Sequence, residues 1–178
     1  MINEIYDYIE SGFKLFGLHG ATGGACNCGD VECTAILKHP VMSNWQNVPH
    51  WSDEQIECFN ELGHFNSGFG VLVKGFLVVD VDARNGGVKS FKQLCKDVPC
   101  ILDCAFVVNT GNGGGSQHYY FKLNDVDKKK SLLQKLDKYK GIDFKSSGYV
   151  VGSGSLHESG SNYETIKGYP QDVDFAPD

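Results

Sequence analysis

The sequence lacks the features of a membrane-spanning or secreted protein. No apolar run approaches the roughly 18–20 residues that span a bilayer. The first ten residues carry acidic side chains where a secretion signal would be basic and then apolar. Proline is also scarce, with 5 residues against 22 glycines, which indicates tight turns and a folded chain. We therefore expect a cytoplasmic protein with no membrane partner.

Positive charge is in deficit, because 16 Lys and Arg residues face 22 Asp and Glu residues, for a net charge of −6. This balance argues against a protein that coats nucleic acid by bulk attraction, so binding of a polyanion must be local or assisted by metal ions. The 178 residues suffice for one main core. Seven cysteines, an odd number without a secretion signal, argue against a disulfide framework and favour metal ligation or burial.

Hydrophobic spacing predicts an alternation of helices and short strands. We expect helices over 3–13, from Ser52 onward, over 88–96 and, with many charges, over 127–139. We expect strands over 70–73, 76–82, 104–109, 117–123, 142–145, 149–151 and 163–167, with Lys74 and Gly75 forming a hairpin turn between the first two. This mixture of hairpins and crossovers predicts the α+β class. Residues 171–178 are acidic and contain proline, so we expect the start of a linker there.

Two carboxylates end the most apolar predicted strand, FLVVDVD. Alternation places Asp80 and Asp82 on one face, about 7 Å apart along the strand, where they repel each other unless a cation or protons intervene. A divalent metal ion satisfies that requirement. The alternative is that the two aspartates only end a strand at a solvated turn.

Two further segments carry polar groups of the same kind. In GIDFK, Asp143 and Lys145 share one strand face. In the segment TGNGGGSQHYYF, glycines allow backbone N–H groups to surround an anion, and Ser116 and His118 can complete a phosphate site. The pattern is neither a Walker loop nor a dinucleotide fingerprint. Taken singly, a histidine such as His118 is more often a structural, hydrogen-bonded residue than a phosphate ligand.

A cysteine-rich segment, ACNCGDVECTAILKHP, predicts a zinc site. Cys26, Cys28, Cys33 and His39 offer three thiolates and an imidazole within fourteen residues, which suits a closed tetrahedral and therefore structural zinc ion. We expect the remaining cysteines to be buried or surface thiols. They are Cys58, Cys95, Cys100 and Cys104.

Together these motifs resemble the bifunctional primase-polymerase (Prim-Pol) domain of the archaeo-eukaryotic primase (AEP) superfamily. The resemblance covers roughly residues 18–170 and rests on the order and spacing of CNCGDVECTAILKHP, LVVDVDARNGG, TGNGGGSQHYYF and GIDFKSSGYVVGSGSLHESGSNYE. It implies an RRM-like catalytic sheet packed with helices. It also implies a nucleotidyltransferase with DNA primase and DNA polymerase activity in phage- or plasmid-type DNA replication.

The resemblance implies a role for each matched residue. Asp80, Asp82 and Asp143 correspond to the catalytic ligands of two Mg²⁺ or Mn²⁺ ions. Ser116 and His118 match the family's S-x-H motif, which contacts the triphosphate of the incoming nucleotide. The remaining nucleotide-binding positions are Lys145 and His157.

The sequence departs from the family pattern at several positions. The loop before His118 is two residues longer than usual, residues 152–155 read GSGS in place of APPS, and Thr165 replaces a tryptophan. These changes bear on the nucleotide pocket and on His157, but they leave the three carboxylates untouched.

Domain limits and partners follow from the same resemblance. We expect a catalytic domain over 1–170, with the zinc-binding loop at about 17–40, acting on a single-stranded DNA template with NTPs or dNTPs. A C-terminal helical domain or a helicase is a further expected partner. Basic residues that could follow the template are Lys38, Arg84, Lys89, Lys145 and Lys167.

Two other functions fit the same residues. A non-catalytic nucleic-acid or nucleotide-binding module would keep the sheet without turnover. A metal-dependent nuclease would use the same carboxylates with water as nucleophile. The intact set of Asp80, Asp82, His118 and Asp143 argues against the non-catalytic module. The S-x-H motif, which suits a triphosphate, favours polymerisation over the nuclease.

Overall fold

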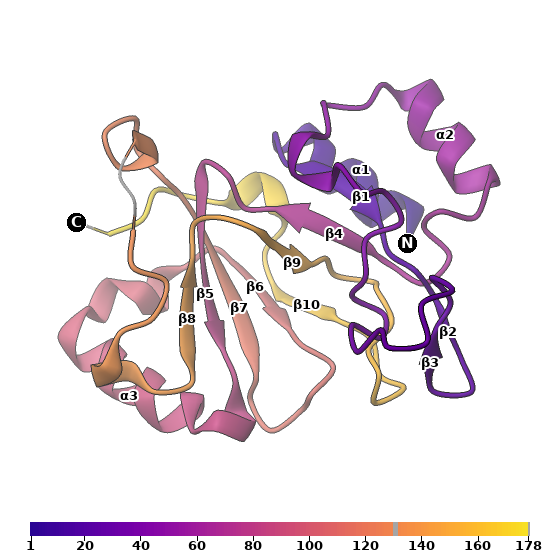
Figure 1. Cartoon of the computed structure of the whole chain (residues 1–178). Helices are drawn as coiled ribbons and strands as arrows, with labels where there is room; N and C mark the ends of the chain where they lie inside the picture. Colours follow the sequence, from indigo (N-terminus) through magenta and orange to yellow (C-terminus); the bar gives the residue numbers. More distant parts are fainter. Residues whose placement is uncertain (130–131, 178) are drawn as a thin grey trace.

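A five-stranded antiparallel sheet forms the centre of the computed structural model, which describes residues 1–129 and 132–177 (Figure 1). The strand order is β10-β6-β7-β5-β8. The bounds are β5 Phe76–Val81, β6 Phe106–Asn109, β7 Gln117–Lys122, β8 Ile142–Lys145 and β10 Glu164–Lys167. Together with the helices below, this sheet confirms the predicted α+β class.

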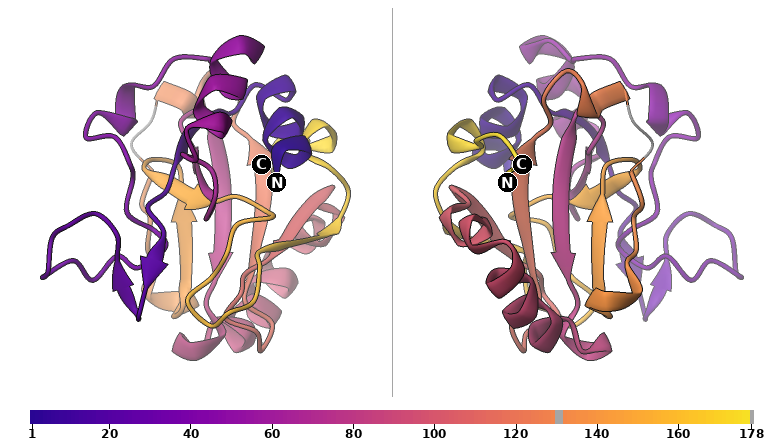
Figure 2. Two further views of the ribbon diagram at one scale, coloured as in Figure 1. Left: turned by 90° about the vertical axis from the view of Figure 1, so that its right-hand side faces the viewer. Right: turned by 90° about the vertical axis from the view of Figure 1, so that its left-hand side faces the viewer.

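A second, three-stranded antiparallel sheet has the order β1-β4-β9, and a short hairpin, β2-β3, projects beyond it (Figures 1 and 2). The bounds are β1 Lys14–Gly17, β2 Ala21–Thr22, β3 Ala25–Cys26, β4 Phe69–Leu72 and β9 Tyr149–Val151. The α-helices are α1 Ile2–Glu10, α2 Asp53–Glu61 and α3 Gly87–Asp97. The 3-10 helices are η1 Trp45–Asn47, η2 Ala83–Asn85, η3 Pro99–Asp103, η4 Asp127–Lys129, η5 Asp137–Tyr139 and η6 Pro170–Asp172.

Alternating side chains of the five-stranded sheet pack into two separate hydrophobic cores, one on each face of the sheet. Val79 and Val81 of β5 belong to one buried cluster together with Leu94 of α3, so α3 covers that face (Figure 2). Val78 and Tyr120 belong to the other cluster, which includes residues of α1 and of the three-stranded sheet. Burial of each such side chain contributes about 1.5–3 kcal/mol to stability. The alternation predicted for β5 is therefore confirmed.

Local signals in the sequence set several element boundaries. The predicted capping box at Ser52 is present, because its hydroxyl accepts from Gln55 N at 3.4 Å and Gln55 Oε1 accepts from Ser52 N at 3.0 Å. The helix expected over 3–13 ends earlier, at Glu10, where Gly12 with a φ of 88° turns the chain toward β1.

The predicted hairpin between residues 70–73 and 76–82 is wrong. The turn exists, with Phe76 N donating to Val73 O at 2.8 Å, but β4 and β5 do not pair. β4 is buried along its whole length and pairs with β1 and β9, whereas β5 pairs with β7 and β8. The turn therefore carries the chain from one sheet to the other.

The predicted charged helix over 127–139 is also wrong in the residues described. Only the short turns η4 and η5 are helical, and residues 130 and 131 lie outside the described residues. Leu133 and Leu136, which a helix here would have to bury, are instead 73% and 39% exposed. Its backbone instead runs beside β8, where Phe144 N donates to Gln134 O at 2.7 Å.

Residues 171–178, expected to begin a linker, instead pack against the fold as far as Ala176. Val173 is buried, Lys122 N donates to Asp174 O at 2.7 Å, and Ala176 N donates to Lys122 O at 2.8 Å. These bonds satisfy the end of β7, while Asp178 lies outside the described residues. None of the helices described has the length and apolar character that a membrane crossing requires.

A close backbone crossing at Gly87 fixes the end of β5, and it yields a stability prediction. A Cβ at Gly87 would lie 2.4 Å from Gly141 O and 2.6 Å from Asp82 O. Because neither backbone can move independently, Gly87→Ala should lower the free energy of unfolding by about 1–3 kcal/mol in urea denaturation. Lys89→Ala, an exposed change in the same helix, should stay within about 0.5 kcal/mol. Equal urea midpoints for the two variants would contradict the proposal that this crossing fixes the end of β5.

Candidate active site and metal cluster

Three polar residues from distant parts of the sequence meet in one row across the five-stranded sheet. Asp80 of β5 is the direct partner of His118 of β7 on one side and of Asp143 of β8 on the other. Directly opposed residues point to the same face, with Cβ atoms about 4.5–5.5 Å apart. The row lies on the face opposite α3, because Val79, Val81 and Ile142 occupy the α3 face.

Positive groups surround the central carboxylate of this row. His118 Nε2 lies 3.5 Å from Asp80 Oδ1, and Lys145 Nζ lies 3.9 Å from Asp80 Oδ2. Burial by itself raises the pKa of Asp80, but the charges of His118, Lys145 and Lys38 outweigh burial and hold that pKa below its ordinary value. Asp80 is therefore a carboxylate at neutral pH, the form that a cation requires.

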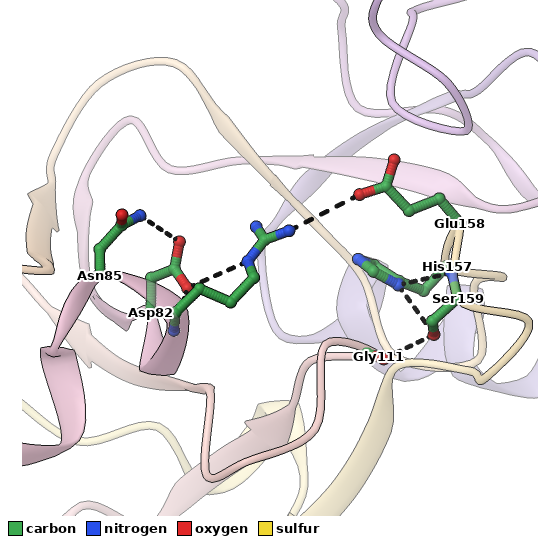
Figure 3. Close-up of polar contacts among 7 residues, drawn as sticks. Asp82, Asn85, Gly111, His157, Glu158 and Ser159 are labelled. Carbon is green, nitrogen blue, oxygen red and sulfur yellow. Dashed lines mark hydrogen bonds and ion pairs between the residues drawn. The ribbon is translucent and has the colours of Figure 1, made fainter.

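The other two carboxylates have different surroundings. Asp143 Oδ1 lies 3.6 Å from Lys135 Nζ. Asp82 caps η2, accepting from Arg84 N at 2.9 Å and from Asn85 Nδ2 at 2.8 Å (Figure 3). A cation at Asp82 would compete with these hydrogen bonds, whereas within the described part of the chain the carboxylates of Asp80 and Asp143 accept no backbone hydrogen bond.

A cleft of about 1010 Å³ holds all three aspartates, together with His118 and Lys145. Residues of β9 and of the segment before α2 line it as well, so the cleft lies between the two sheets. This volume is at the upper end of the range of about 300–1,000 Å³ that is typical of small-molecule sites.

Two buried polar atoms that belong to cleft-lining residues have no hydrogen-bond partner among the residues described. They are His118 Nδ1 and Thr110 Oγ1, in side chains that are 4% and 7% exposed. An unpaired buried polar group costs about 1–3 kcal/mol, so such atoms indicate a site built for a polar ligand. Thr110 was not singled out from the sequence, although its place directly before GNGGG was an available signal.

Ser116 does not line the cleft. Its buried hydroxyl accepts from Ala83 N at 2.9 Å, and its carbonyl accepts from Thr110 N at 3.0 Å. Ser116 thereby ties the glycine-rich loop to the first residue of η2, directly after Asp82. The structure places this residue behind the site and His118 within it.

His157 also lies behind the cleft, against the glycine-rich loop. Its Nδ1 accepts from Ser159 N at 3.0 Å, and Ser159 Oγ donates to Gly111 O at 2.6 Å (Figure 3). A Cβ on Gly111 would lie 2.2 Å from His157 Cβ, so only glycine fits there. Burial, followed by the nearby charge of Lys38, lowers the pKa of His157, which is therefore neutral at neutral pH.

Arg84 joins the two sides of this region. Its guanidinium lies 3.4 Å from Asp82 Oδ1 through Nε and 3.8 Å from Glu158 Oε1 through Nη1 (Figure 3). Of the five basic residues that the sequence suggested for template binding, Lys38, Arg84 and Lys145 line the cleft. Lys89 lies on α3, and Lys167 donates to Leu102 O at the β10 edge of the sheet.

The predicted Cys/His ligands come together in a separate cluster. One ligand atom from each of Cys26, Cys28, Cys33 and His39 lies within 4.8 Å of all the others, so the cluster could bind zinc. The loop closes where His19 N donates to His39 O at 2.8 Å. Burial raises the pKa of the Cys26 thiol to about 11, so binding of a metal ion must displace its proton.

Comparison with known protein families identifies the family of this chain. The family model described as "Bifunctional DNA primase/polymerase, N-terminal" matches residues 6–178, nearly the whole chain. No curated protein matches the sequence.

The Cys/His cluster predicts a specific metal content. The purified protein should hold one zinc ion per chain by elemental analysis, and Cys33→Ser should lose it because a ligand atom is removed. Cys58→Ser, a change of an exposed thiol outside the cluster, should keep the ion. Equal zinc content in the two variants would contradict the ligand assignment.

Proposed function

Because the chain belongs to the bifunctional DNA primase/polymerase N-terminal family, we propose that it catalyses template-directed nucleotidyl transfer as a DNA primase and DNA polymerase in phage- or plasmid-type replication. The substrates in this proposal are a single-stranded DNA template and nucleoside triphosphates. A C-terminal helical domain or helicase as partner stays a prediction.

One observation carries the proposal: the row of His118, Asp80 and Asp143 in a cleft large enough for a nucleotide. The row combines carboxylates for divalent cations with a buried, unpartnered imidazole nitrogen for an anionic ligand. A nucleoside triphosphate with its metal ions offers cations to the carboxylates and an anionic phosphate to the imidazole. A nuclease would need the carboxylates but has no specific use for the unpaired His118 nitrogen.

The donor set of the cleft fits hard divalent cations such as Mg²⁺ or Mn²⁺, which prefer carboxylate oxygens. Asp80 and Asp143 would hold such ions, and Asp82 would join them after releasing its bonds to η2. When bound, two such ions lower the pKa of the attacking 3′-hydroxyl and offset the charge of the leaving pyrophosphate. Ionisation of Asp80 at neutral pH is the contribution of the protein to this binding.

We assign the remaining residues by their position relative to the cleft. His118 and Lys145 contact the triphosphate directly, because both line the cleft beside Asp80. Ser116 and His157 act on the nucleotide through the glycine-rich loop, which their hydrogen bonds and packing hold in place. The catalytic domain in this proposal includes residues 171–177, because that segment packs against β7.

The Cys/His cluster would hold a structural zinc ion. Its four ligands complete a tetrahedral shell, which leaves no position for water or substrate. It lies in a loop of exposed residues that has little apolar side chain to bury. Zinc binding would therefore supply the folding free energy that this loop lacks.

Removal of either carboxylate of the row should abolish catalysis. Asp80→Asn and Asp143→Asn should each lower the rate of primer extension, with labelled template, nucleotides and Mn²⁺, by on the order of 10³-fold because cation binding is lost. Asp125→Asn, at a position 92% exposed and outside the cleft, should extend at the normal rate.

The same assay separates the competing functions. Shortening of the labelled strand without extension would support a nuclease, and binding without either product would support a non-catalytic module. Extension by Asp80→Asn at the normal rate would contradict the assignment, provided that circular dichroism shows the same fold for both proteins.

Lys145 should affect nucleotide binding more than the chemical step. Lys145→Gln should raise the KM for the incoming nucleotide by roughly tenfold or more, since one charge-assisted bond to phosphate is lost, with a smaller change in kcat. Lys89→Gln, on α3 and outside the cleft, is the matched control and should leave both parameters unchanged. A lower kcat with unchanged KM would contradict this role.

A further inference from the structure

An aromatic and a basic side chain line the cleft from the three-stranded-sheet side, and the function proposed above assigns a ligand contact to neither. They are Trp45, in η1, and Lys38, just before the metal-cluster ligand His39. Tyr149 of β9 lies between them, since its ring contacts Trp45 and its hydroxyl donates to Lys38 O.

The ring of Trp45 is held in place at the cleft. It is tilted against Phe16 at 5.4 Å and meets Tyr149 edge-on at 4.9 Å. It is only partly buried, and within the described residues its indole N–H has no hydrogen-bond partner. A rigid, partly exposed indole ring is suited to stacking.

Trp51, the other tryptophan of the chain, shows the opposite character. Its Nε1 donates to Leu15 O at 2.8 Å, its ring packs edge-on against Phe59 at 4.9 Å, and it does not line the cleft. Trp51 is therefore a structural residue and supplies an internal control for Trp45.

Lys38 is available to a ligand while its backbone is fixed. Its carbonyl accepts from Tyr149, its N–H donates to Ala35 O at 3.0 Å, and the preceding Leu37 is buried with a φ of 59°. Among the residues described, the ammonium groups of Lys38 and Lys140 form no ion pair, whereas the other two lysines of the cleft, Lys135 and Lys145, each face a carboxylate. A cation held at a cleft without a counter-ion attracts an anion.

The combination of a stacking ring and a nearby cation is the chemistry that binds single-stranded nucleic acid. Bases of an unpaired strand stack on aromatic side chains irrespective of sequence, and lysine contacts the adjoining phosphate. In a duplex the base faces are covered by their neighbours, so a ring of this kind reaches only an unpaired base.

We propose that Trp45 and Lys38 form a subsite for one nucleotide of single-stranded DNA, with the base stacked on Trp45 and a phosphate at Lys38. The inference rests on the proposed function, because the bound strand is the template of that reaction. It adds the place where the template enters the cleft, on the side of the three-stranded sheet.

Tryptophan fluorescence tests the subsite directly in the full chain. In Trp51→Phe, Trp45 is the only fluorophore of its kind, and oligo(dT) added without nucleotide or added Mg²⁺ should quench its emission. In the matched variant Trp45→Phe, emission of the remaining Trp51 should not change on the same titration.

Binding of a labelled oligo(dT) measures the contribution of each side chain. Trp45→Ala should weaken binding by about tenfold, and Trp45→Phe by less, because a smaller ring still stacks. Lys38→Gln should reduce the slope of log affinity against log salt by about 0.7, the value for one phosphate contact to a single strand. Lys89→Gln should match the unmodified protein.

Failure of the subsite and failure of the proposed function are distinguishable, because these titrations require no catalysis and can be repeated in Asp80→Asn. Oligo(dT) that binds without quenching Trp45, or that binds Lys38→Gln with an unchanged salt slope, overturns the subsite while extension activity stands. Quenching by a free nucleoside triphosphate but not by oligo(dT) overturns it as well. If Trp45→Ala does not fold, the quenching and salt-slope measurements still test the subsite, because they do not use that variant.

Discussion

The register of β5 between β7 and β8 is the constraint on which the site depends. It places Asp80 directly between His118 and Asp143, three residues separated by tens of positions in the chain. A shift of one residue in either pairing would turn a polar side chain toward the α3 core and an apolar one toward the cleft. Burial of Val79, Val81 and Ile142 against α3 therefore fixes the chemistry on the other face.

The sequence supported this row in advance because strand alternation is a local property. It assigned Asp80 and Asp143 to defined strand faces, and the structure confirms those faces through the two cores. Strand pairing is not local, so the turn at Lys74 was taken for a hairpin although β4 has other partners. Trp45 and Thr110 were missed for the same reason, since their place in the cleft depends on how the two sheets meet.

Asp82 shares a strand face with Asp80, but its surroundings give it a different role. Alternation placed it beside Asp80, and it does line the cleft, but its carboxylate caps η2 and contacts Arg84. Each of these bonds is charge-assisted and contributes about 1.5–3 kcal/mol at most, less where solvent screens it. A dication bound at the row, as we propose, would outweigh them, so Asp82 would rearrange on metal binding, whereas Asp80 is already ionised and oriented for it.

The Cys/His loop and the cleft meet at a single peptide bond, between Lys38 and His39. Leu37 holds a left-handed backbone conformation that costs a non-glycine residue about 1–3 kcal/mol, and its burial compensates for that cost. On the other side, His39 belongs to the Cys/His cluster. A metal ion bound at that cluster would therefore fix Lys38 from the second direction, and with it the position of the cation that we propose for template binding.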